Sequence, residues 1–162
     1  VPFVTVAKGT RTAPTPVVSA TTMNTITVDP VSEAEYGILP TGSTDPVVYG
    51  SSNEFTGLTH STQYTVYLRL LENDSYVISG PSTINVTTSA PAFGDIDGDG
   101  EISVADVIAA LEIAVGYPDY TADQVLRANV NSKTDMTVDI FDVILLIERV
   151  IGDITPFPVD VE

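Results

Sequence analysis

A twelve-residue stretch with the sequence DIDGDGEISVAD carries acidic side chains at a regular spacing. Positions 1, 3, 5 and 12 of this stretch are Asp95, Asp97, Asp99 and Asp106. Calcium takes about six to eight oxygen ligands, which alternate residues of a tight loop can point inward. Gly100 at position 6 permits the sharp turn, and Glu101 at position 7 offers its backbone carbonyl. Because carboxylates this close repel one another unless a cation neutralises them, we predict a calcium site here rather than a solvated acidic turn.

A second, less regular loop lies further along the chain. Its candidate ligands are Asn129, Asn131, Asp135, Thr137 and Asp142. Strict counting back from Asp142 at position 12 puts Lys133 at position 3, directly against a cation. Taking Asn129 and Asn131 as positions 1 and 3 instead requires two extra residues within the loop. Few of these ligands are charged, so we expect either a weaker second calcium site or a loop that is kept by packing alone.

Each loop leads into an apolar stretch of helical length, Val104–Val115 and Ile140–Ile151, and a glycine follows each stretch. A glycine just after the last periodic residue is typical of a helix C-terminus. A shift of 36 residues superposes the two stretches and places Asp106 on Asp142. One amphipathic helix cannot bury its apolar face alone, so we expect the two repeats to pack as a pseudo-twofold pair.

The acidic residues are concentrated in the second part of the 162-residue chain, whose net charge is −16. Residues 1–90 have 3 Lys or Arg and 7 Asp or Glu (net −4), whereas residues 91–162 have 3 and 15 (net −12). Ser and Thr change in the opposite direction, from 27 to 6. This step predicts a domain boundary near Ala90, with residues 1–13 as an extra strand or linker, 14–90 as an all-β sandwich and 91–162 as an all-α domain.

Short alternating stretches rich in β-branched and aromatic residues indicate the strands of the first domain. They are 17–20, 25–28, 36–38 and 64–70, with turn signals between them. The stretch 55–64 is similar to the turn before the penultimate strand of a fibronectin type III module, over roughly 14–88. That resemblance implies an immunoglobulin-like sandwich in which a leucine fills the core and the Tyr64 hydroxyl bonds back to upstream backbone. The usual core tryptophan of the family is missing, because the chain has no Trp.

The second domain resembles a dockerin over roughly 93–152. The segments GDIDGDG from Gly94 and RANVN from Arg127, together with the two helical stretches, carry this likeness. The resemblance implies paired calcium loop–helix repeats that bind a cohesin module of a scaffoldin. Such proteins assemble polysaccharide-degrading complexes outside anaerobic bacteria, so an extracellular or cell-surface location is implied as well. The preceding sandwich would be a spacing or stabilising X module, and we expect it to pack on the helical domain.

The resemblance also implies a partner-binding face at loop positions 10 and 11 and along one side of each helix. In the first repeat these residues are Val104, Ala105, Ile108, Leu111, Glu112 and Val115. In the second they are Ile140, Phe141, Ile144, Ile147, Glu148 and Ile151. The second helix has more apolar residues than one core-facing stripe requires, so the extra stripe either packs inside the protein or meets a partner.

Composition and residue content weigh against several other classes of function. The acidic balance disfavours nucleic acid and anionic membranes, and no stretch is apolar for long enough to span a bilayer. With His60 as the single histidine and no cysteine, we expect no enzyme and no cofactor besides calcium. An alternative is a calcium-stabilised adhesion or carbohydrate-binding fragment that acts through the sandwich, with Tyr36, Tyr49, Tyr67 or Tyr76 stacking on sugar rings.

The two ends of the helical domain carry aromatic and proline residues. Phe93 precedes the first loop, and Pro156, Phe157 and Pro158 follow the second helix. Contact between these residues would clasp the domain shut, and a disordered tail is the alternative.

Overall fold

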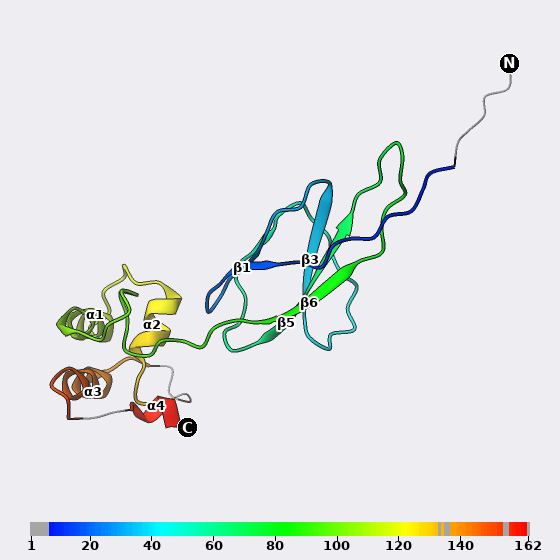
Figure 1. The fold of residues 1–162 in the computed structure, drawn as a ribbon. Helices are drawn as coiled ribbons and strands as arrows, with labels where there is room; N and C mark the ends of the chain where they lie inside the picture. Colours follow the sequence, from blue (N-terminus) through cyan, green and yellow to red (C-terminus); the bar gives the residue numbers. More distant parts are fainter. Residues whose placement is uncertain (1–6, 133, 135–136, 154–155, 162) are drawn as a thin grey trace, which may run out of the picture. The chain divides into compact units, whose positions relative to one another are not determined.

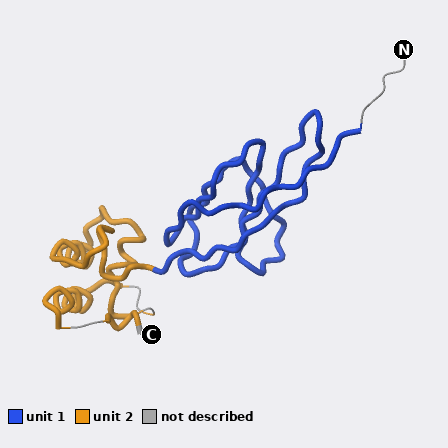
Figure 2. The backbone as a smooth tube through the Cα atoms, viewed as in Figure 1, with its two compact units in different colours: residues 1–90 blue, residues 91–162 orange. Residues whose placement is uncertain are grey.

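The computed structural model describes residues 7–132, 134, 137–153 and 156–161. The chain divides into two compact units, Val1–Ala90 and Pro91–Glu162, which Figure 2 draws in blue and orange. The division falls where charge and Ser/Thr content change along the sequence. Each unit has a cluster of buried apolar side chains of its own. The expected packing of the first unit on the second stays a prediction.

The described part of the first unit forms two antiparallel sheets (Figure 1). Their strands are β1 (Val18–Thr21), β2 (Ile26–Val28), β3 (Ala34–Pro40), β4 (Glu54–Phe55), β5 (Gln63–Leu70) and β6 (Ser82–Thr87). One sheet has the order β1-β2-β4 and the other has the order β3-β5-β6. This is how an immunoglobulin-type sandwich distributes its strands when the fourth strand is absent. The prediction of a β-sandwich followed by helices is confirmed at this level.

The alternation of β5 builds half of the buried sandwich core. Tyr64, Val66, Leu68 and Leu70 are buried, and they pack in one cluster with residues of β2 from the other sheet. The intervening side chains of β5 are more exposed, as a strand with one buried face requires. The Tyr64 hydroxyl accepts a hydrogen bond from the backbone N–H of Thr59 at 2.9 Å, so the turn before β5 is tied back as the resemblance implied.

The segment before β1 belongs to the first unit. Gly9 forms an isolated parallel bridge with Tyr76, and Ala13 is buried in the sandwich core. Arg11 forms an ion pair with Glu33 at 2.7 Å, and its guanidinium also donates to the backbone carbonyl of Leu71. The described residues 7–13 are therefore an extended segment held by a single bridge and by side chains. The remainder of the predicted 1–13 element lies outside the described residues.

The described part of the second unit is helical. Its elements are α1 (Val104–Ala114), α2 (Ala122–Ala128), α3 (Ile140–Val150) and the short α4 (Pro158–Val161). The helices α1 and α3 begin and end at residues 36 apart, as the sequence repeat predicts. The helix α2 was not among the predicted elements, although Thr121 and Gln124 form the reciprocal capping box that marks its start.

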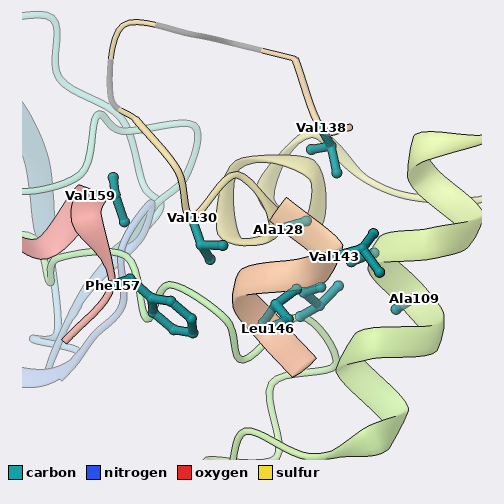
Figure 3. Close-up of a cluster of buried hydrophobic side chains, with 10 residues drawn as sticks. Ala109, Ala128, Val130, Val138, Val143, Leu146, Phe157 and Val159 are labelled. Carbon is teal, nitrogen blue, oxygen red and sulfur yellow. The ribbon is translucent and has the colours of Figure 1, made fainter. Parts of the chain in front are cut away.

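Small side chains on α1 let the two repeated helices pack closely. Ala109 and Ala110 of α1 share a buried cluster with Val143 and Leu146 of α3, and Figure 3 shows most of these side chains converging. The alternation of small and large residues across a helix pair fills the space between them without voids. This core positions the two loops, because each loop runs directly into one of the paired helices.

The C-terminal segment completes this core. Phe157 is almost fully buried in this cluster (Figure 3). A Cβ on Gly94 would lie only 2.6 Å from its ring. Gly94 also has a φ of +88°, which L side chains rarely adopt. A side chain there would therefore be strained both by the backbone conformation and by the contact with Phe157. Val159 donates its N–H to the carbonyl of Val130 at 3.3 Å. The ends of the unit are thus clasped, with Phe157 as the buried aromatic and Phe93 half-buried against the same core.

Candidate functional site

The first loop gathers three carboxylates at one place. One oxygen atom from each of Asp95, Asp97 and Asp99 lies within 4.8 Å of the other two. Gly98 and Gly100, with φ of +82° and +93°, allow the backbone to turn around this cluster. Asp95 is buried, whereas Asp97 and Asp99 are exposed. Of the residues that the structure describes, this is the one group of three or more acidic, His or Cys side chains that could hold a metal ion.

Backbone amides of the loop hold these carboxylates in place. Asp95 accepts from the N–H of Gly98 at 2.8 Å and from that of Gly100 at 3.3 Å. Oδ1 of Asp97 accepts from the N–H of Asp99 at 3.1 Å. Oδ1 of Asp99 accepts from the N–H of Glu101 at 2.8 Å. Within the described residues, Oδ2 of Asp97 and Oδ2 of Asp99 accept no hydrogen bond. These two oxygens are therefore free for a hard cation, which fits the predicted ligand set.

Asp106 ties the start of the loop to the start of α1. Its side chain is fully buried, and Oδ1 accepts from the N–H groups of Ile96 at 2.7 Å and Asp97 at 3.3 Å. Oδ2 accepts from the N–H of Ser103 at 2.8 Å, which completes the capping box of α1. Asp106 thus has a structural role beside the predicted role as a ligand, and each carboxylate oxygen can accept more than one interaction.

The same closure recurs in the second loop and fixes its register. Asp142 is fully buried and accepts from the N–H groups of Val130 at 2.9 Å and Asn131 at 3.0 Å. It also accepts from the N–H of Asp139 at 2.9 Å, and Asp139 caps α3. Val130 therefore corresponds to Ile96 with an offset of 34 residues, whereas the helices are offset by 36. The two extra residues lie between these points, so Asn131 is the residue that corresponds to position 3.

The second loop places amide oxygens where the first has carboxylates. Asn129 corresponds to Asp95 and is buried, and Asn131 corresponds to Asp97. Oδ1 of Asn131 is buried without a hydrogen-bond partner among the described residues. A buried carbonyl oxygen left without a partner costs about 1–3 kcal/mol, so a bound cation there would be favoured. Thr137 is exposed, and the predicted ligand Asp135 lies outside the described residues.

Burial raises the pKa of Asp142 above its ordinary value, and the three backbone N–H groups that donate to it act in the opposite direction. In the absence of metal, the charged form of this carboxylate is therefore less favoured than that of a solvated aspartate. A cation beside Asp142 would restore the charged form, which is how metal binding and protonation compete for one ligand.

Both repeated helices expose an apolar face. Of the twelve predicted partner-binding residues, ten are exposed: Val104, Ala105, Ile108, Leu111, Val115, Ile140, Phe141, Ile144, Ile147 and Ile151. Glu112 and Glu148 are half-buried. We define the docking face as these twelve residues. The apolar residues of this face are not buried in the described core. Exposed apolar surface of this kind is typical of an interaction site.

Glu112 makes a contact that the sequence did not predict. The Tyr120 hydroxyl donates to Oε2 of Glu112 at 2.5 Å, and this hydrogen bond raises the pKa of Tyr120 to about 12. The contact fixes the connection between α1 and α2 against the end of the docking face. Tyr117, in the same connection, is exposed and adds an aromatic side chain that is not among the predicted partner-binding residues.

The tyrosines proposed for sugar stacking are mostly engaged elsewhere. Tyr36 is buried, and its hydroxyl accepts from the N–H of Val31 at 2.6 Å. The guanidinium of Arg69 lies 3.8 Å from the ring centroid of Tyr49, and that of Arg11 lies 5.5 Å from the ring centroid of Tyr76. Rings already covered on one face by a cation offer a smaller stacking surface, and Tyr67 is half-buried.

Comparisons with known proteins bear on the first unit alone. No known family model and no curated protein matches the chain. A computationally redesigned β-sandwich protein matches 46% of this chain and 86% of its own, with 15% identity and a TM-score of 0.37. The fibronectin type III domain of human fibronectin type III domain containing protein 3 matches 52% and 91%, with 15% identity and a TM-score of 0.39. These likenesses are slight, and the fold assignment rests on the strand pairing.

Among the described residues, no helix is both long enough and apolar enough to cross a membrane.

Proposed function

We propose that the second unit is a calcium-dependent docking module of the dockerin type. It would attach its parent protein to a cohesin module of a scaffoldin, in a polysaccharide-degrading complex outside the cell. The observation that carries this proposal is the repeated closure of a loop onto a helix by Asp106 and Asp142, which places an acidic loop beside an exposed apolar helix face.

Calcium in the first loop would be held by Asp95, Asp97, Asp99 and Asp106, with the backbone carbonyl of Glu101. When bound, the ion supplies positive charge that offsets the repulsion among these carboxylates. The residues of the chain fit this role, because the loop gathers three carboxylates and leaves Oδ2 of Asp97 and Oδ2 of Asp99 without a described N–H donor. The second loop would hold a weaker ion through Asn129, Asn131, Asp135, Thr137 and Asp142, since amide oxygens replace two of the carboxylates.

The docking face supports recognition of a largely apolar partner surface. Ile144, Ile147 and Ile151 lie three and four residues apart on α3, so they form one stripe along the helix. Removing such a stripe from water is the main favourable term in most protein–protein association. Glu112 and Glu148 would lie within this contact and set its orientation rather than its strength.

The first unit would act as a fibronectin type III-like X module that spaces the docking module from the rest of its parent protein. We propose no enzymatic activity for either unit. His60, the single histidine, lies in the turn before β5, and none of the ion pairs between described residues includes it. The alternative, a glycan-binding or adhesion fragment, is less well supported because the candidate tyrosines are buried or covered.

Calorimetric titration of the chelator-treated chain with calcium should give one tight and one weaker binding event. D97N should weaken the tight event roughly tenfold or more, equivalent to about 1.4 kcal/mol, because it removes one of the four charges among the proposed ligands. D119N is the matched control, since it removes the same charge from an exposed position outside both loops. The helical circular dichroism signal should fall in chelator and return with calcium.

Two tight events of equal affinity would contradict the unequal ligand sets of the two loops. The absence of any binding would contradict the proposed calcium site. Binding to glycans without binding to cohesins would instead favour the adhesion alternative.

A further inference from the structure

Arg127, in the last turn of α2, contacts the acidic loop through both its backbone and its side chain. Its carbonyl accepts the N–H of Gly94 at 2.8 Å, at the start of that loop. Its guanidinium lies over Gly98, where an added Cβ would be 3.2 Å from Nη1. Gly98 stands between Asp97 and Asp99, so the guanidinium lies beside the acidic cluster.

The charge of Arg127 has no direct partner in the described part of the protein. Its Nε is buried and makes no hydrogen bond. The ion pairs found between described residues all lie within the first unit, so no carboxylate of the described residues is within salt-bridge distance of Arg127. A guanidinium stays protonated at any ordinary pH, and a partly desolvated charge interacts with its neighbours at longer range than an exposed one. The nearby aspartates are therefore its electrostatic counterpart.

We propose that Arg127 is a built-in counter-charge of the first loop. It stabilises the loop when no cation is bound, and by the same interaction it lowers the affinity of the loop for calcium. A positive group beside the site stabilises the empty loop, which carries its full carboxylate charge, more than the loaded loop, in which a divalent cation offsets two of those charges. By linkage, a group that favours the empty state weakens binding. The second half of this proposal rests on the proposed calcium site, whereas the first half does not.

The test compares the full chain with R127M, which removes the charge and keeps an apolar stem, and R127K, which keeps the charge. In chelator, R127M should unfold at a lower temperature than R127K. In calcium, R127M should bind at the tight site roughly threefold to tenfold more strongly than the wild type, the range expected for the removal of one partly screened neighbouring charge. R127K should stay close to the wild type in both measurements. Raising the salt concentration should shrink the difference between R127M and R127K.

Stabilisation of the empty loop by Arg127 and its effect on calcium affinity are measured separately, and each result is distinguishable from a failure of the proposed calcium site. If the wild type binds no calcium, the calcium site is wrong, and the thermal midpoints in chelator still decide whether Arg127 stabilises the empty loop. Equal midpoints for R127M and R127K in chelator would overturn that stabilising role. If R127M binds calcium as the wild type does, or more weakly, the counter-charge role is overturned, because Arg127 would then act only by shaping the loop.

Discussion

Replacing Asp106 by alanine should unfold the second unit and leave the first unit folded. The buried carboxylate accepts hydrogen bonds from the backbone N–H groups of Ile96, Asp97 and Ser103, and D106A would leave all three without a partner. The hydrogen bond from Ile96 is buried and the other two are partly buried. A fully buried N–H left without a partner costs about 1–3 kcal/mol, and a whole small domain is stable by only about 5–15 kcal/mol. The measurement is the helical signal at the far-ultraviolet minimum, recorded during thermal unfolding.

The repeat supplies a matched comparison for this prediction. D142A removes the same three hydrogen bonds from the second loop and should have an effect of similar size. D106N keeps an acceptor at Oδ1 and loses the one at Oδ2, so it should be intermediate. If D106A keeps the helical signal and the thermal midpoint of the wild type, the closure of the loops by buried aspartates does not hold the unit together.

Placing a charge on the docking face should abolish partner binding without disturbing the fold. Ile144 and Ile147 are each 43% exposed, so aspartate at either position can reach water in the free protein. In a complex the same carboxylate would be buried without a partner, which costs at least about 2 kcal/mol and commonly more. We expect I147D and I144D to reduce cohesin affinity by roughly 100-fold or more while calcium binding stays as in the wild type.

V48D is the control for this pair of variants. Val48, in the first unit, is 83% exposed, so the substitution makes a similar chemical change far along the chain from the docking face. It should leave partner binding, calcium binding and thermal stability unchanged. Normal binding by both I144D and I147D would place the docking surface elsewhere on the molecule.

The parts of the fold that depend on local periodicity could be predicted from the sequence. The alternation over Gln63–Leu70 and the apolar periodicity of α1 and α3 gave these elements to within a few residues, because burial on one face imposes a period of two or of 3.6. The acidic loop was recognisable for a similar reason, since its ligand positions follow from one short segment.

Features that depend on contacts between distant segments could not be predicted in the same way. The register of the second loop was ambiguous until the hydrogen bonds from Val130 and Asn131 to Asp142 fixed it. The burial of Phe157 against Gly94 joins residues 63 positions apart. The contact between the Arg127 side chain and Gly98 could not be predicted, because nothing local indicates it. The capping box of α2, by contrast, lies within one short segment and is predictable from the sequence.

The central claim is that the chain docks onto a partner through its second unit and that calcium is required. The most direct measurement is the affinity of the full chain for a panel of immobilised cohesins, in calcium and again after chelation. We predict binding with a dissociation constant on the order of nanomolar to at least one cohesin in calcium, and its loss in chelator. Binding that is unchanged by the chelator, or no binding to any cohesin while calcium is bound, would contradict the claim.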